Sequence, residues 1–144
     1  MPIFSILAAV SLIVPAGETF SCTPVRVWDG DGPLWCAEGP RIRLAGIAAR
    51  EHDETCRSNQ PCPVASAEQS RDALVRIIGK ARGFAPEGHV LVSGSTLTCK
   101  SEGGAGGKRT AAWCNSPQKG DVSCAMIRTG TVLPWQRYWR DHHC

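Results

Sequence analysis

The chain of 144 residues has room for one domain and a short N-terminal segment, so we expect a single domain. Its formal net charge is +3, and the segment from Lys108 to Cys144 holds six Lys and Arg residues against two Asp. A basic C-terminal quarter is typical of a surface that attracts a polyanion, although a solvated basic face explains the charge equally well.

The N-terminal segment is apolar. Residues Ile3 to Val14 form a run of twelve nearly all apolar residues, and a Pro-Ala-Gly triplet ends it. A membrane span requires about 20 such residues, so the run is too short to cross a membrane but fits the core of a signal peptide. No Lys or Arg precedes the run, so an uncleaved anchor or a buried first strand is the alternative. We predict a signal peptide over residues 1–20, a mature domain over residues 21–144, and a periplasmic or secreted protein.

The next stretch, from Val25 to Glu51, alternates runs of Val, Ile, Leu and Trp with two turn-forming segments at residues 29–32 and 38–40. This alternation predicts three strands joined by tight turns. Asp31 ends the first of these strands, and Arg43 lies within the third. Two carboxylates and a guanidinium on one face, from Asp31, Glu51 and Arg43, suit phosphate and metal chemistry.

A polar loop over residues 52–63 leads to the first helix. Ser66 and Gln69 have the spacing of a capping box, and apolar residues at helical spacing follow until Gly79. The remaining expected elements, in chain order, are strands over residues 89–93 and 96–100, a glycine-rich loop over 101–107, a last strand over 109–114, and a second helix from the cap Asp121 to Gly130.

The eight cysteines are an even and dense set for this length, and none has the C-x-x-C spacing of a zinc or redox site. Together with the apolar leader, they indicate disulfides formed in an oxidising compartment. The expected strands and loops favour pairing between neighbours, namely Cys22–Cys36, Cys56–Cys62, Cys99–Cys114 and Cys124–Cys144.

The tail carries two further candidates. His142, His143 and Cys144 have the residue types of a transition-metal site, but a disulfide at Cys144 is the competing interpretation. The aromatic residues of the tail suit either stacking on bases or sealing an edge of the core.

Several motifs together resemble the staphylococcal nuclease-like (thermonuclease) family. They are V-x-V-x-DGD, IRLAGI followed by a Glu, a helix, a glycine-rich loop ending in an Arg, and the final helix DVSCAMIRTG, and they cover about Val25 to Val132. The resemblance implies an α+β fold: a small five-stranded OB-type β-barrel with two or three helices, here braced by disulfides. It also implies hydrolysis of phosphodiester bonds in DNA and RNA with calcium.

The resemblance implies a role for each motif residue. Asp31 matches a metal ligand, Arg43 and Arg109 match residues that contact the phosphate, and Glu51 matches the residue that orients or deprotonates the attacking water. The family's second metal-binding Asp falls on Ala48 here, which would weaken calcium binding because affinity depends on the number of charged ligands.

Other groups near this position are candidate replacements for the missing ligand. They are the backbone carbonyl of Ala49 and the side chains of Asp53, Asp29, His52 and Glu54. Two departures from the family pattern accompany the loss at position 48: Arg50 stands where Pro is usual and Gly32 where Thr is usual.

Two functions therefore remain open. The first is an exported, metal-dependent nuclease that acts as a monomer on DNA or RNA and contacts no membrane after signal removal. The second is a catalytically inactive module of the same fold that binds nucleic acid or a protein partner. The presence of Glu51 favours the enzyme because a binding module has no need of it, whereas Ala48 and Arg50 favour the module.

Overall fold

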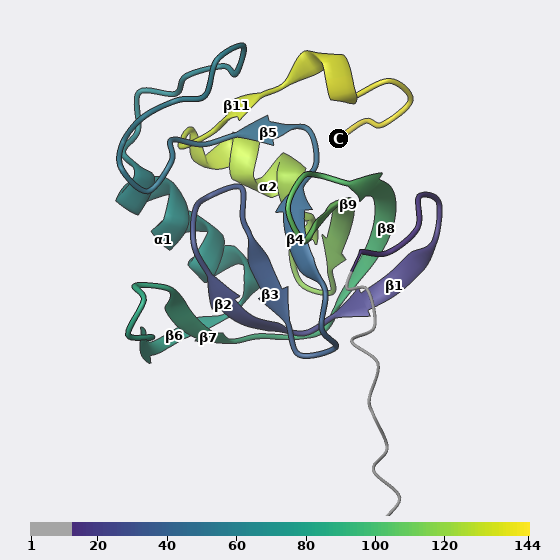
Figure 1. Ribbon diagram of the computed structural model, residues 1–144, viewed down its shortest axis with the longest axis horizontal. Helices are drawn as coiled ribbons and strands as arrows, with labels where there is room; N and C mark the ends of the chain where they lie inside the picture. The colour runs from purple at the N-terminus through teal and green to yellow at the C-terminus, as the bar shows by residue number, and fades with distance from the viewer. Residues whose placement is uncertain (1–12) are drawn as a thin grey trace, which may run out of the picture.

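The computed structural model describes residues 13–144, and most of the predicted signal-peptide core lies outside this range. The fold is α+β, and its main sheet curls into a half-barrel (Figure 1). The strands, in chain order, are β1 (Thr19–Cys22), β2 (Pro24–Val27), β3 (Leu34–Cys36), β4 (Arg41–Leu44), β5 (Ile47–Ala48), β6 (Lys80–Phe84), β7 (Val90–Ser93), β8 (Leu97–Gly104), β9 (Arg109–Ser116), β10 (Gly120–Asp121) and β11 (Leu133–Pro134).

The main sheet contains nine strands in the order β1-β8-β9-β4-β3-β2-β7-β6, with β10 paired to β9. The expectation of five strands is therefore wrong. The three strands β2, β3 and β4 form the predicted antiparallel meander. The pairing of β4 with β9 is parallel, and it places Arg41 opposite Arg109. A separate pair of short strands, β5 and β11, joins the tail to the segment after the meander.

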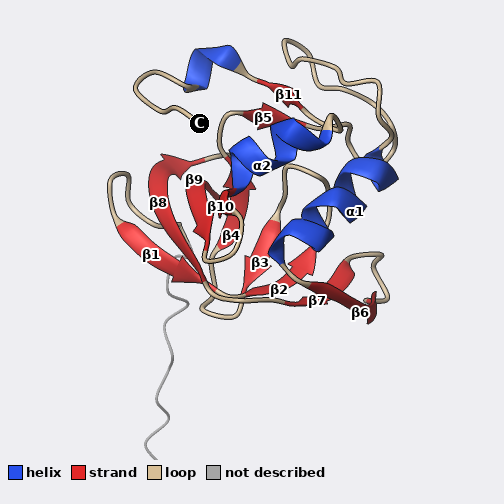
Figure 2. Ribbon diagram, turned by 180° about the vertical axis from the view of Figure 1, so that it is seen from behind, coloured by secondary structure: helices blue, strands red, loops and turns tan. Residues whose placement is uncertain are grey.

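Two helices, α1 (Ala67–Ile78) and α2 (Val122–Thr129), contact each other and pack against the curled sheet (Figure 2). The Ser66 side chain accepts a hydrogen bond from the Gln69 amide, and the Gln69 side chain accepts one from the Ser66 amide, which confirms the predicted capping box. Asp121 caps α2, and Gly130 ends it in the left-handed conformation, with a φ of 76°. A short 3-10 helix, η1 (Gln136–Tyr138), follows in the tail.

The core lies between the concave face of the sheet and the two helices. Its largest fully buried side chains include Leu34, Ile42 and Leu44 from the meander, Leu74 from α1 and Met126 from α2. Side chains alternate between the two faces of a strand. Because the apolar side chains of the meander face the core, its polar side chains lie on the opposite face of the sheet.

All four expected disulfides are present. Cys99 and Cys114 lie directly opposite each other on β8 and β9, and Cys144 ties the tail to α2. Each disulfide closes a loop that stabilises the folded chain by roughly 2–3.5 kcal/mol, if the effect is counted as lost entropy of the unfolded chain.

The N-terminal residues that the structure describes pack on the sheet. The Val14 amide donates to Thr110 Oγ1, at 3.0 Å, and the Gly17 amide donates to the Ser101 carbonyl, at 2.8 Å. The predicted domain boundary at residue 20 falls within β1. Across residues 13–144, no helix is long and apolar enough to span a membrane.

Candidate functional site

An open groove of about 1410 Å³ lies between the meander, the start of β9 and the tail. Asp31, Arg43, Glu51 and Arg109 all line it. Residues that are far apart in the sequence thus meet on one surface, as the motif positions predict.

Asp31 and Arg43 form a largely buried ion pair in the groove. Arg43 Nη2 lies 3.2 Å from Asp31 Oδ2, and this oxygen also accepts a hydrogen bond from the Ala49 amide, at 3.1 Å. Arg43 Nη1 donates to the carbonyls of Leu44 and Ile47, at 2.6 and 2.8 Å. These bonds hold the guanidinium in a single orientation, so little reorganisation is needed for it to meet an anion.

The positive charge of Arg43 does not fully offset the effect of burial on the pKa of Asp31. Burial raises the pKa of the Asp31 carboxyl, whereas the Arg43 charge and the Ala49 amide lower it, and the net direction is upward. Asp31 is therefore an acid whose charge is costly unless a further cation lies near it.

Asp29 is a second buried acid on the same turn, with 3% of its surface exposed. Burial, followed by the charges of Asp31 and Glu51, raises the pKa of Asp29 to about 8. Its Oδ1 atom is buried and has no hydrogen-bond partner among residues 13–144. Because Asp29 also lines the groove, it presents an unsatisfied oxygen beside the two predicted site carboxylates.

Glu51 is more accessible, with 28% of its side chain exposed. Its Oε1 atom lies 3.1 Å from Nε of Arg57, a residue of the following loop that also lines the groove. Apart from a basic residue next to Cys56, no sequence pattern indicates this pairing.

Arg109 reaches the groove because β9 runs parallel to β4. Arg41 and Arg109 are in register, and Arg43 lies two residues beyond Arg41, so the three side chains share one face of the sheet. Burial, followed by the charges of Arg57 and Arg43, lowers the pKa of Arg109. Arg109 Nη2 donates to the Ala105 carbonyl at 2.8 Å, which fixes it against the glycine-rich loop.

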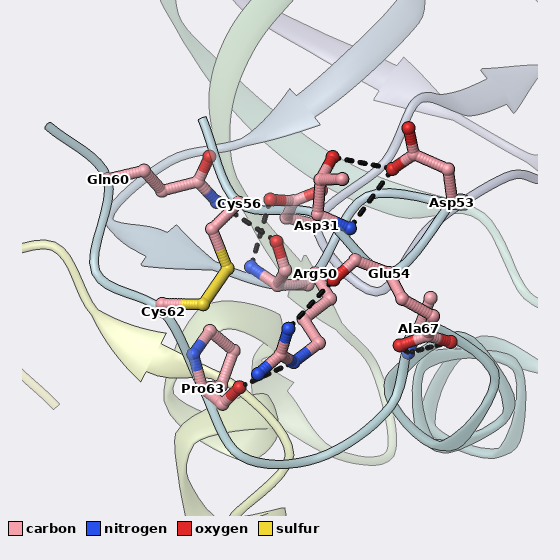
Figure 3. Close-up of a disulfide and its surroundings, with 11 residues drawn as sticks. Asp31, Arg50, Asp53, Glu54, Cys56, Gln60, Cys62, Pro63 and Ala67 are labelled. Atoms are coloured by element: carbon pink, nitrogen blue, oxygen red, sulfur yellow. Dashed lines mark hydrogen bonds between the residues drawn. A yellow bond between two sulfur atoms is a disulfide. The ribbon is translucent and has the colours of Figure 1, made fainter. Parts of the chain in front are cut away.

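The candidate replacement ligands do not all reach the groove. The Asp53 side chain is fully exposed, bonds to Thr55 and is absent from the lining of the groove (Figure 3). The carboxylate of Glu54 accepts the Ala67 amide at the start of α1, at 3.0 and 3.1 Å. The Ala49 carbonyl accepts Gln60 Nε2 at 3.0 Å, and the Ala48 side chain is fully buried. Of the acidic candidates, Asp29 is the one in place.

The aromatic residues of the groove were only partly anticipated. Trp135 and Trp139 of the tail donate to the Gly46 carbonyl through the Trp135 amide and Trp139 Nε1, at 2.7 and 2.8 Å. The Arg43 guanidinium lies 5.9 Å from the centre of the Trp135 ring. On the other wall, Arg41 lies 3.9 Å over the Trp35 ring, a contact with no periodic signal in the sequence.

The disulfide interpretation of the tail is confirmed, because Cys144 is bonded to Cys124. Asp121, Cys124 and His142 bring ligand atoms within 4.8 Å of one another, but the Cys124 sulfur is bonded to Cys144. His142 instead contacts Asp121 and stacks on Trp113, with ring centres 3.6 Å apart.

A scan of protein-family models, a search of curated proteins and a search of solved structures found no match for this chain. The likeness to the staphylococcal nuclease-like family therefore stays a prediction from the motifs quoted above.

Proposed function

We propose that this protein is an exported nuclease that hydrolyses phosphodiester bonds of DNA or RNA in the groove, with the help of a divalent cation. The single observation that supports the proposal best is the convergence of Asp31, Arg43, Glu51 and Arg109 on one groove. Phosphoryl chemistry needs neutralisation of the phosphate charge and a positioned water, and these residue types supply both.

Each residue has a distinct role in the proposed reaction. Arg43 and Arg109 donate hydrogen bonds to the non-bridging phosphate oxygens and stabilise the charge that grows on them in the transition state. Glu51 accepts a proton from the attacking water as a general base. Asp31 orients Arg43 through their ion pair, and its carboxylate would also serve as a ligand for the cation.

The donor set fits a divalent cation held by few protein ligands. Asp29 and Asp31 offer hard carboxylate oxygens, and the unpartnered Oδ1 of Asp29 is the kind of atom that a cation satisfies. Among the described residues, no three groove side chains bring ligand atoms within 4.8 Å of one another, so water and phosphate oxygens would complete the coordination. When bound, the ion would neutralise phosphate charge and acidify a coordinated water.

Digestion of labelled single-stranded DNA and RNA, with calcium titrated against a chelator, tests the proposal. Glu51→Gln should lower the cleavage rate at least about a hundredfold, because general-base catalysis contributes about 10²–10⁴. Glu68→Gln, which alters an exposed acid in α1 outside the groove, is the matched control. Equal cleavage by Glu51→Gln and the wild type would remove Glu51 from the mechanism.

The inactive binding module is the second candidate. It is favoured by the fully buried Ala48 and by the ion pair that occupies Glu51. A folded protein that binds single-stranded nucleic acid but does not cleave it, whichever divalent ion is added, would establish the module instead.

A further inference from the structure

The loop after Glu51 is held in place although it has no regular secondary structure. The Cys56–Cys62 disulfide closes it, and Gln60 Nε2 donates to the Ala49 carbonyl (Figure 3). Arg50 donates from Nη1 to the Glu54 carbonyl and from Nε to the Pro63 carbonyl, at 2.7 and 2.8 Å. The loop is therefore anchored near both of its ends.

This anchoring delivers Arg57 to the groove. Arg57 lies within the disulfide-closed segment, lines the groove and contacts Glu51 through its Nε atom at 3.1 Å. Its charge acts on Arg109 together with that of Arg43. The guanidinium groups of Arg43, Arg57 and Arg109 thus line the same groove.

We propose that Arg57 is a third phosphate-binding residue of this site, and that substrate phosphate replaces Glu51 as its partner when a polynucleotide binds. This inference rests on the proposed nuclease function and goes beyond the four motif residues. The site would thus bind polyanionic chains that place a phosphate beside Glu51.

The exchange follows from the relative strength of the two contacts. The Arg57 side chain is 59% exposed, and an ion pair in such contact with water is weak. A guanidinium donates two parallel hydrogen bonds to a phosphate, which makes that contact stronger and more directional.

The exchange also releases Glu51. In the free protein its carboxylate is engaged by Arg57, and it cannot serve that partner and a water equally well. Once Arg57 has moved to the phosphate, Glu51 can accept a proton. Arg57 thereby couples substrate binding to the availability of the proposed base.

Binding of a fluorescein-labelled single-stranded oligodeoxythymidine, measured by anisotropy in chelator over a series of salt concentrations, tests this role without hydrolysis. The variants are Arg57→Gln, Arg57→Lys, Glu51→Gln and the double variant of Arg57→Gln with Glu51→Gln. Arg128→Gln, at an exposed position of α2 outside the groove, removes the same charge elsewhere. Thermal unfolding and intact mass confirm that each variant is folded with four disulfides.

We expect Arg57→Gln to weaken binding roughly tenfold, the worth of a charge-assisted hydrogen bond, and Arg57→Lys to recover part of the loss. The slope of log affinity against log salt should shrink by about 0.7, the value for one phosphate contact on a single strand. Glu51→Gln should bind the oligonucleotide at least as tightly as the wild type. Any gain in affinity over the wild type should be absent when Arg57→Gln is present as well. Arg128→Gln should keep the wild-type slope.

Two results would overturn the inference while leaving the nuclease proposal intact. One is an unchanged affinity and salt slope in Arg57→Gln, and the other is tighter binding by Arg57→Gln, which would make Arg57 a block on the groove. A wild-type protein that neither binds nor cleaves the oligonucleotide would instead overturn both proposals.

Discussion

Replacement of Asp29 by Asn should stabilise the protein at neutral pH and reduce the loss of stability as pH rises. The pKa of Asp29 is about 8 in the folded chain and has an ordinary value of 3.8 when unfolded. Between these values the folded state holds a proton that the unfolded state has lost, so unfolding is favoured by raising the pH. One such proton lowers the free energy of unfolding by about 1.4 kcal/mol for each pH unit above the unfolded pKa. The accumulated loss at pH 7 is about 4 kcal/mol.

Asn is a close match for the neutral acid. Its amide group keeps the shape of the Asp29 carboxyl and, like the protonated acid, is neutral and able to donate a hydrogen bond. The variant therefore keeps the shape of the side chain and removes the ionisation that burial makes costly.

Urea unfolding at several pH values between about 5 and 8, in chelator and with disulfides intact, measures the effect. The wild type should lose unfolding free energy with pH, and Asp29→Asn should reduce that slope by about 1.4 kcal/mol per unit. Because the pKa of Asp31 is also raised, some slope should remain. Identical slopes in the two proteins, or wild-type stability that rises with pH, would refute the assignment of a proton to Asp29.

Three further outcomes are expected. Gly46→Ala should lower the unfolding free energy by roughly 2–4 kcal/mol in urea, because the new Cβ would overlap the Trp113 ring at a φ of 78°; an unchanged midpoint would contradict this packing. Ser66→Ala should cost about 1 kcal/mol in the same assay through loss of the α1 cap, and a neutral effect would mean that α1 does not need it. Millimolar calcium should raise the thermal midpoint of the wild type, and Asp31→Asn should abolish the rise; an equal rise in both would place the ion elsewhere.

Local rules predicted much of the fold. The capping box at Ser66 and the stop at Gly130 each depend on a few neighbouring residues, so both are visible in sequence and both are confirmed. The pairing of Cys99 with Cys114 followed from two strands expected to be neighbours, and they are.

Non-local features escaped prediction for physical reasons. Every residue of β6 is exposed, so this edge strand lacks the alternation of buried and exposed residues that identifies a strand. The expected glycine-rich loop begins inside β8, because strand pairing with β9 continues through Gly104. The contact of Arg57 with Glu51 depends on the path of an irregular loop, which no periodicity encodes.

The sequence motifs predicted that Arg109 would lie near Arg43, but they did not predict the strand pairing that brings the two together. The motif order predicted that Arg109 would join Arg43, and both line the groove. The cause is the parallel pairing of β4 with β9, a long-range contact between segments that differ in sequence character. The sequence predicted which residues would lie together, and the sheet topology explains how they do.

The energetics of the groove favour a functional role over a structural one. Burial raises the pKa of both Asp29 and Asp31, so each destabilises the fold at neutral pH relative to a neutral side chain. A module that used the groove only as a basic surface would be more stable at neutral pH with an amide at position 29. Asp29 has an unpartnered buried oxygen, and Asp31 is bonded to the guanidinium of Arg43. Both features fit the proposed site for a cation and a phosphate.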